Sequence, residues 1–249
     1  EFMMAGAYTP YVLQTGILAT ATGTAFLVSV PVAFVVAGLM GLALDRLLLA
    51  RMRGRPLDTL LVTFGVSLIL QQLARDLFGA PNVNVVAPEW LKGNVRLLDV
   101  AMPYSRLFIM GLVIAVVAAV WAFLTLSPAG RRMRAVMQHR DLAAVSGLPT
   151  RRVDGTTFFL GSGLAGVAGV GISLIGAIGP ATGTSYVVDA FLVVIVGGIG
   201  KLRGAVIAAL ALGLLNSFSE FWSSPNLGKS IVFVAVVVFL QFRPNGVVS

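Results

Sequence analysis

Long apolar runs alternate with short clusters of charged residues along the whole chain. A helix that crosses the hydrocarbon core of a bilayer needs about 20 predominantly apolar residues. The main charge-free runs cover residues 2–44, 59–74, 107–130, 155–188, 190–200, 204–219 and 230–242. One helix over the first run would be about 64 Å long, so we divide it near residues 20–24 into a short piece around 5–19 and a fuller span around 25–44. The pattern predicts an all-α, polytopic transmembrane bundle with about six to eight membrane segments.

Composition supports a membrane protein and excludes several kinds of site. Of the 249 residues, 57% are hydrophobic and 11% are charged, whereas a water-soluble domain carries about 25% charged residues. The absence of cysteine excludes a disulfide framework, a thiolate metal centre and a thiol nucleophile. The single histidine, His139, excludes a multi-histidine metal site. We therefore expect no metal and no cofactor, and we treat residues 1–249 as one transmembrane domain.

The basic residues indicate the orientation of the chain. The formal net charge is +8, and cytoplasmic loops of membrane proteins are enriched in Lys and Arg. If residues 45–58 lie in the cytoplasm and each segment crosses the membrane, residues 127–154, 201–203 and the C-terminal tail lie in the cytoplasm as well. Residues 75–106, 177–185 and 220–229 then lie outside. The cytoplasmic basic residues are then Arg46, Arg51, Arg53, Arg55, Arg131, Arg132, Arg134, Arg140, Arg151, Arg152, Lys201, Arg203 and Arg243. They account for most of the 18 basic residues, so we assign the charge to membrane orientation and not to nucleic acid.

Two segments depart from the simple pattern. The run 186–200 is short and ends in Gly197-Gly198-Ile199-Gly200, where continuing a helix is costly; we expect a broken or partly re-entrant helix. The chain begins abruptly in hydrophobic sequence without a signal peptide. We expect one or more membrane helices upstream; the alternative is that Glu1 and Phe2 are a cloning remnant.

Small residues recur at every fourth position in two of the apolar runs. Gly161, Ala165 and Gly169 are followed by Ser173, and a similar series runs Ala209, Gly213 and Ser217. Such faces let helix backbones approach closely in lipid. We expect both series to be helix-packing faces.

Polar residues inside apolar runs are the candidates for a solute path. Thr63, Ser67 and Gln71 lie four residues apart and share one helix face. Polar groups are costly in a membrane unless they bond to a partner or face water, so this stripe either lines a path or bonds to another helix. Asn216 lies in a similar, more terminal polar group, and Asp189 either caps the short broken helix or faces the path.

The largest cytoplasmic loop contains a candidate docking helix over residues 127–147. Ser127 suits the N-cap, Pro128 suits the first helical position, and Gly147 suits the end. Apolar positions lie beside several arginines, so the helix either rests on anionic lipid or docks a cytoplasmic partner.

Catalytic motifs are missing from the sequence. Gly228-Lys229-Ser230 lacks the upstream glycine of a phosphate-binding loop, and Gly200-Lys201-Leu202 lacks its hydroxyl residue. No Ser-His-Asp set or paired carboxylates fall in one segment. We infer that this chain is not an enzyme and does not hydrolyse ATP.

The cytoplasmic loop and the sequence after it resemble permease subunits of ABC importers of the branched-chain amino acid family. The resemblance rests on residues 130–136 (GRRMRAV), 140–147, 157–169 and 196–200 (VGGIG). It implies a second permease subunit, two ATP-binding subunits and an extracytoplasmic solute-binding protein as partners, in the plasma membrane. It also implies that the loop 127–154 couples to the ATPase, through Arg131, Arg134, Arg140, Asp141, Ala143, Ala144 and Gly147.

Within that family the chain is most similar to the urea permease subunit. The segments that carry this similarity are 54–61, 65–72, 151–154, 178–180 and 227–229, whereas Lys201, Arg203 and Asn245 depart from the expected pattern. The resemblance implies urea import. The alternatives are an amino acid permease of the same family, a self-contained channel or secondary transporter, and a structural membrane subunit.

Overall fold

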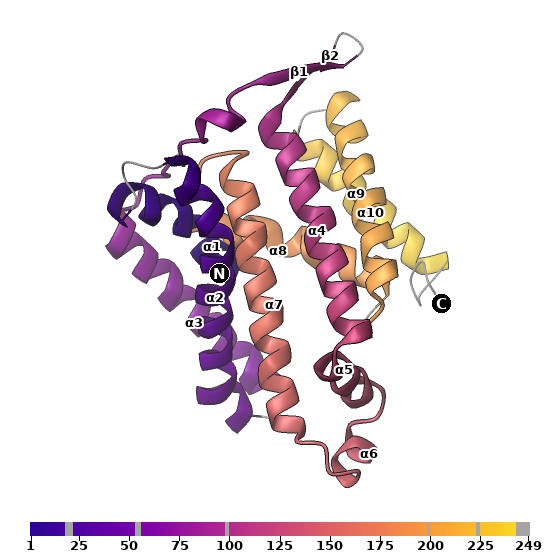
Figure 1. Cartoon of the computed structure of the whole chain (residues 1–249). Helices are drawn as coiled ribbons and strands as arrows, with labels where there is room; N and C mark the ends of the chain where they lie inside the picture. Colours follow the sequence, from indigo (N-terminus) through magenta and orange to yellow (C-terminus); the bar gives the residue numbers. More distant parts are fainter. Residues whose placement is uncertain (18–21, 53–55, 98–99, 199, 223–224, 243–249) are drawn as a thin grey trace. The chain divides into compact units, whose positions relative to one another are not determined.

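The protein is helical almost throughout. The structure is a computed structural model that describes residues 1–249 except 18–21, 53–55, 98–99, 199, 223–224 and 243–249. The helices in the described part are α1 (Phe2–Val12), α2 (Thr22–Leu47), α3 (Pro56–Phe78), α4 (Tyr104–Leu126), α5 (Pro128–Gln138), α6 (Arg140–Val145), α7 (Thr150–Ser173), α8 (Thr182–Gly197), α9 (Leu202–Trp222) and α10 (Pro225–Phe242) (Figure 1). Strands β1 (Asn94–Leu97) and β2 (Val100–Pro103) form a small antiparallel hairpin that the sequence did not predict.

Five helices are long and apolar enough to cross a membrane. They cover Gly23–Arg51, Leu57–Phe78, Tyr104–Leu126, Thr150–Ser173 and Leu202–Trp222, and Thr182–Gly197 and Leu227–Phe242 are shorter apolar helices. The prediction of a polytopic helical bundle is therefore confirmed. The first apolar run contains α1, a π-helical turn over Leu13–Ile17 that continues it, and then α2. The predicted division near residues 20–24 falls partly on residues 18–21, which lie outside the described residues.

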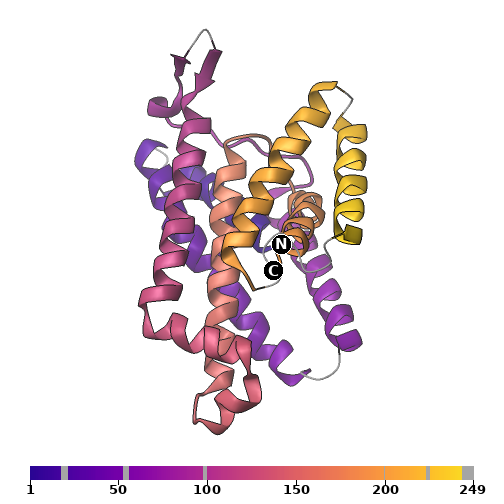
Figure 2. The same cartoon turned by 90° about the vertical axis from the view of Figure 1, so that its right-hand side faces the viewer.

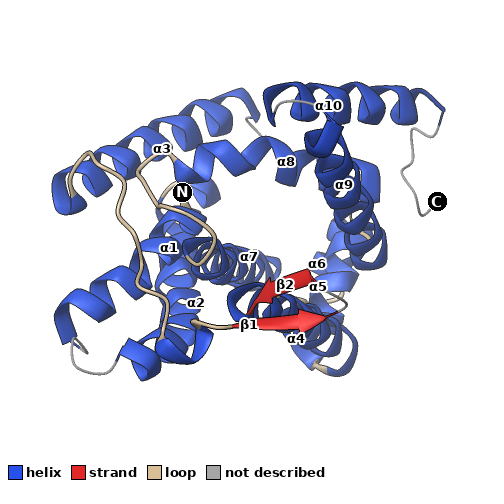
Figure 3. Cartoon of the chain, turned by 90° about the horizontal axis from the view of Figure 1, so that it is seen from above, coloured by secondary structure: helices blue, strands red, loops and turns tan. Residues whose placement is uncertain are grey.

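Contacts divide the chain into two compact units, Glu1–Gly183 and Thr184–Ser249. In the first unit α7 packs along both α1 and α2 (Figure 3). A Cβ added at Gly166 would lie 2.6 Å from the Ala33 carbonyl oxygen, and one at Gly169 would lie 2.7 Å from the Ala7 backbone nitrogen. The absence of side chains at these two glycines lets the backbones approach, which is how helices associate in lipid.

The packed face of α7 differs from the predicted series of small residues. Gly169 and Ser173 are buried in it, but Ala165 is only partly buried and Gly161 is exposed, with open space where its Cβ would be. Each step of four residues turns an α-helix about 40° beyond a full turn, so a four-residue series winds away from its neighbour. Gly161 therefore points about 80° away from Gly169 and lies outside the contact with α1.

The two ends of the first unit group the loops as the predicted topology requires. At one end Val83 and Ile178 exchange backbone hydrogen bonds of 2.8 and 2.9 Å, which joins the loops 75–106 and 177–185 that we expect outside. The end of α2 and the helices α5 and α6 lie together at the opposite end of the unit from this pairing (Figures 1 and 2). The β1–β2 hairpin and the α5–α6 segment are at opposite ends of α4 (Figure 1).

The second unit is built on α8, α9 and α10. Its core joins Val196, Ala208, Leu212, Val232 and Val236. The expected break lies directly after α8, where Gly198 and Gly200 both have positive φ, 88° and 84°, a conformation that glycine adopts without strain. The second small-residue series is not a packing face within this unit: Ala209, Gly213 and Ser217 are exposed, one position away from the buried Ala208 and Leu212.

Candidate solute cavity

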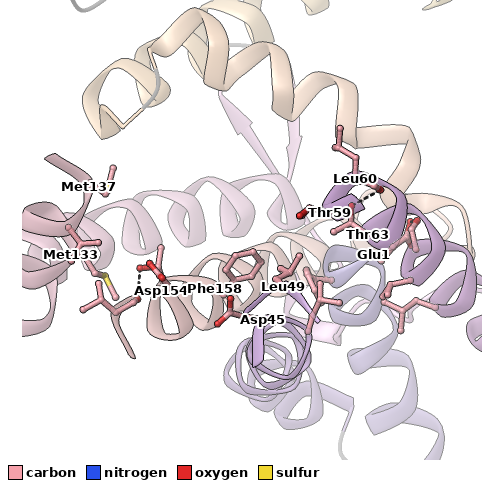
Figure 4. Close-up of a pocket in the computed structure, with 18 of the residues that line it drawn as sticks. Glu1, Asp45, Leu49, Thr59, Leu60, Thr63, Met133, Met137, Asp154 and Phe158 are labelled. Carbon is pink, nitrogen blue, oxygen red and sulfur yellow. Dashed lines mark hydrogen bonds between the residues drawn. The ribbon is translucent and has the colours of Figure 1, made fainter. Parts of the chain in front are cut away.

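A cavity of about 690 Å³ lies in the first unit. Its walls come from the start of α1, the end of α2, one face of α3, and parts of α5, α6 and α7. In Figure 4, Glu1 and Thr63 lie on one side of this space and Met133 and Met137 on the other. Most of the lining is apolar: Phe2, Leu44, Leu49, Leu60, Val66, Leu70, Met133, Val136, Met137, Val153 and Phe158.

Two of the three residues of the predicted polar stripe line this cavity. Thr63 and Ser67 do so, and Gln71 lies one turn further along α3. The Thr63 hydroxyl donates to the Leu60 carbonyl oxygen of its own helix at 3.0 Å, which satisfies its hydrogen within α3.

Ser67 and Gln71 converge on Glu1. The Ser67 hydroxyl donates to Glu1 Oε1 at 2.7 Å and the Gln71 amide donates to the same oxygen at 2.8 Å. The Gln71 amide also donates to Ser67 Oγ at 3.3 Å. Hydrogen bonds to a carboxylate are stronger than those between neutral groups, so the two α3 side chains hold the Glu1 carboxylate at the cavity wall.

Glu1 is the site residue that sequence reasoning missed. Gln71 was one of the candidates for the solute path, and in the structure its amide donates to Glu1. The other oxygen, Glu1 Oε2, is buried without a hydrogen-bond partner in the described part of the chain. The sequence contained one sign that could have identified Glu1: it is an acidic residue next to the apolar run 2–44. An ionisable group inside a membrane protein usually has a functional role.

The wall opposite Glu1 carries an ion pair between two helices. Arg140 of α6 donates to both carboxylate oxygens of Asp154 of α7, at 3.3 and 2.7 Å. The third carboxylate of the lining, Asp45, is 3% exposed. The cavity therefore combines apolar walls with three carboxylates and one guanidinium group.

The predicted coupling helix is present as two helices. Ser127 caps α5 as expected, because its hydroxyl accepts from the Gly130 backbone N–H at 2.9 Å. The chain is extended at His139, with φ −147° and ψ 95°, and this residue separates α5 from α6. Gly147 has φ 80° and follows the end of α6, as predicted.

The break at His139 lets both short helices pack on α7. Met133 and Val136 of α5 and Ala143 of α6 form one buried cluster with Val153. Ala143 is therefore internal and does not face a partner. The other residues that the resemblance assigns to ATPase coupling are exposed: Arg131, Arg134, Arg140, Asp141, Ala144 and Gly147. Val145, one of the apolar positions expected to make contacts on this helix, is 88% exposed, and Leu142, which was not predicted to contribute, is 64% exposed.

Asp189 and Asn216 line a separate cavity of about 620 Å³ in the second unit, together with Lys229. Asp189 lies in the interior of α8, which begins at Thr182, so the expected capping role is wrong. The Asn216 amide donates to Glu220 Oε1 at 2.9 Å along α9. The five predicted path residues thus fall into two groups, one in each unit.

Membrane-crossing helices around a cavity define a polytopic transport protein. The chain belongs to a family described as the branched-chain amino acid transport system permease component, which matches residues 1–241. Among its relatives is the high-affinity branched-chain amino acid transport system permease protein LivH of Escherichia coli, 25% identical over 100% of this chain and 83% of LivH. BraD of Pseudomonas aeruginosa, a protein of the same description, is 25% identical over 86% of this chain and 72% of BraD.

More distant similarity extends to a sugar permease. The ribose import permease protein RbsC of Haemophilus influenzae is 26% identical over 61% of this chain and 48% of RbsC. No solved structure matches the chain. The chain is a multi-pass plasma-membrane protein and the permease component of an ABC transport system.

Proposed function

We propose that this chain is the permease subunit through which an ATP-driven importer moves branched-chain amino acids. The observation that carries the proposal is the cavity of the first unit, whose walls are largely apolar and whose lining includes the Glu1 carboxylate held by Ser67 and Gln71. The relatives LivH and BraD, whose names include branched-chain amino acid transport, support it. Urea, the substrate first expected from the sequence, has no apolar part to match such walls.

The cavity suggests how an amino acid is held during passage. The α-ammonium group donates to the Glu1 carboxylate, and the branched side chain lies against residues such as Leu44, Val66 and Phe158. Burying a leucine or valine side chain contributes about 1.5–3 kcal/mol, while a charge-assisted hydrogen bond contributes about 1.5–3 kcal/mol. These moderate contributions allow binding and release.

The proposal requires partner subunits that are not part of this chain. A second permease subunit completes the pathway, two ATP-binding subunits supply the energy by hydrolysing ATP, and an extracytoplasmic binding protein delivers the solute. We assign the ATPase contact to the exposed surface of α5 and α6, which carries Arg131, Arg134, Leu142 and Val145. The Arg140–Asp154 pair and the buried cluster around Val153 then transmit movement of this surface to α7.

Uptake by the assembled transporter in proteoliposomes tests this function. Labelled leucine should enter only when ATP is present on the cytoplasmic side, and excess urea should not compete. ATP-driven uptake of urea without leucine uptake would establish the urea alternative instead. Uptake by the permease alone, without ATP, would show a self-contained channel or secondary transporter.

The role of Glu1 is tested with the leucine analogue 4-methylpentanoate, which lacks the ammonium group. Binding-protein-free transporter should bind leucine better than this analogue, and Glu1→Gln should remove most of that preference. Glu1→Asp, which keeps the charge, should retain part of it. An unchanged preference in Glu1→Gln would exclude the ammonium contact.

A further inference from the structure

A second cavity of the first unit, of about 580 Å³, gathers four arginines at the end where α2 stops and α7 starts. Its basic lining consists of Arg46, Arg51, Arg151 and Arg152. Asp45 is the acidic residue among the lining residues, so the four guanidinium groups outnumber the carboxylates. None of these arginines forms an ion pair with a described carboxylate.

Several like charges around one cavity repel one another unless an anion lies between them. Arg51 uses one N–H on the Leu47 carbonyl oxygen at 2.7 Å, and a guanidinium group has five N–H donors, so most of its donors remain available. Arg151 and Arg152 stand in the first turn of α7, where a positive charge is disfavoured by the helix dipole. All four arginines are exposed, so water screens part of this repulsion, and a negatively charged ligand would relieve the rest.

The rest of the lining indicates what carries that negative charge. Leu42 and Phe159 add apolar surface to the cavity. Arg46 and Arg51 lie at the last residues of the candidate span Gly23–Arg51, and Arg151 and Arg152 lie at the first residues of the span Thr150–Ser173. The arginines thus stand at the level where a helix leaves the hydrocarbon core, with apolar side chains beside them.

We infer that this cavity binds the headgroup of an anionic phospholipid. Guanidinium groups match phosphate oxygens in bidentate hydrogen bonds, and basic pockets between membrane helices are suited to anionic headgroups. Leu42 and Phe159 contact the first part of the acyl chains. A free phosphate ion would satisfy the arginines equally well but would gain nothing from this apolar surface.

Lipid binding to the purified, assembled transporter tests the inference. Phosphatidylglycerol and phosphatidylcholine with the same acyl chains are titrated in detergent, and bound lipid is counted by native mass spectrometry. The wild type should bind phosphatidylglycerol in preference. The double variant Arg151→Gln/Arg152→Gln should bind it about 25-fold more weakly, at about fivefold for each arginine. Arg46→Gln/Arg51→Gln changes the same cavity from the other helix and should have a similar effect.

The matched control is Arg75→Gln/Arg106→Gln, which removes the same charge from exposed positions outside this cavity and outside the α5–α6 surface. It should keep the wild-type affinity within about twofold. Equal weakening in the control and the cavity variants would overturn the inference, because it would show diffuse attraction of lipid to the basic surface. Displacement of the lipid by millimolar inorganic phosphate would also overturn it, in favour of a free-anion site. Unchanged lipid binding with loss of the ATP-binding subunits in both cavity variants would show a protein contact instead.

Discussion

Gly169 lies where the backbones of α7 and α1 approach each other closely. Its added Cβ would contact the Met3 carbonyl oxygen and would lie 2.7 Å from the Ala7 nitrogen, and backbone atoms cannot turn aside as a side chain can. We expect Gly169→Ala to destabilise the permease by about 1–3 kcal/mol, the usual cost of overpacking. Gly169→Leu should prevent assembly. Thermal unfolding of the purified complex measures the first effect, and size-exclusion chromatography measures the second.

Gly161 provides the matched control on the same helix. No atom lies within 4 Å of its added Cβ, so Gly161→Ala should leave the unfolding temperature essentially unchanged. A similar loss of stability in both variants would contradict the packing described here and would indicate that alanine disturbs α7 itself.

For single residues, the sequence shows which positions are candidates for a site or a packing face better than it shows what each one contacts. The four-residue spacing correctly indicated a small-residue face on α7, but the helix turn moves Gly161 out of that face. Ser67 and Gln71 were found because they are polar residues in an apolar run. Their common partner was not, since Glu1 precedes Ser67 by 66 residues and no local pattern joins positions so far apart.

Among the elements, α5 depends on its cap. The Ser127 hydroxyl is the acceptor for the Gly130 N–H, one of the four amides that have no partner inside a helix. Ser127→Ala should therefore destabilise α5 by about 1 kcal/mol. Hydrogen exchange at the first turn of α5 should become about fivefold faster. Ser127→Asn, which also caps well, should exchange at nearly the wild-type rate, and equal acceleration in both variants would exclude a capping role.

The exposed apolar side chains of α6 give a second prediction for an element. Leu142 and Val145 are 64% and 88% exposed beside charged neighbours, which favours a partner surface over lipid. Leu142→Ser/Val145→Ser should weaken association with the ATP-binding subunits at least about tenfold. Leu142→Met/Val145→Ile keeps the apolar surface and should preserve association. Weakening by both pairs would mean that shape or helix stability matters more than apolar contact.

The termini of α5 and α6 were predictable and the break between them was not. Ser127, Pro128 and Gly147 act locally, through caps and a positive φ that short sequence patterns encode. The break at His139 depends on α7, because it places Ala143 on Val153 in the same cluster as Met133 and Val136. A tertiary contact of this kind leaves no signature in the loop sequence.

Across the whole molecule, membrane character follows from composition while the cavities follow from packing. The apolar runs indicated a polytopic helical bundle because each run must span or enter the bilayer on its own. They could not show that Thr63 and Ser67 share a cavity with Asp154, whereas Asp189 and Asn216 line another in the second unit. The Val83–Ile178 pairing shows in turn that the two loops expected outside meet at one end of the first unit.

Orientation in the membrane can be measured with single cysteines, because this chain contains none. Val145 on α6 is 88% exposed and Val86 before β1 is 56% exposed, so a cysteine at either position should be reachable without disturbing the core. In intact cells an impermeant maleimide should label Val86→Cys. Val145→Cys should be labelled only in inverted vesicles that have been stripped of the ATP-binding subunits, because Val145 lies on the surface assigned to them. The physical reason is the arginine excess around α5 and α7, which favours the cytoplasmic side. Labelling of Val145→Cys in intact cells would reverse the topology, and with it the assignment of α5 and α6 to the ATPase.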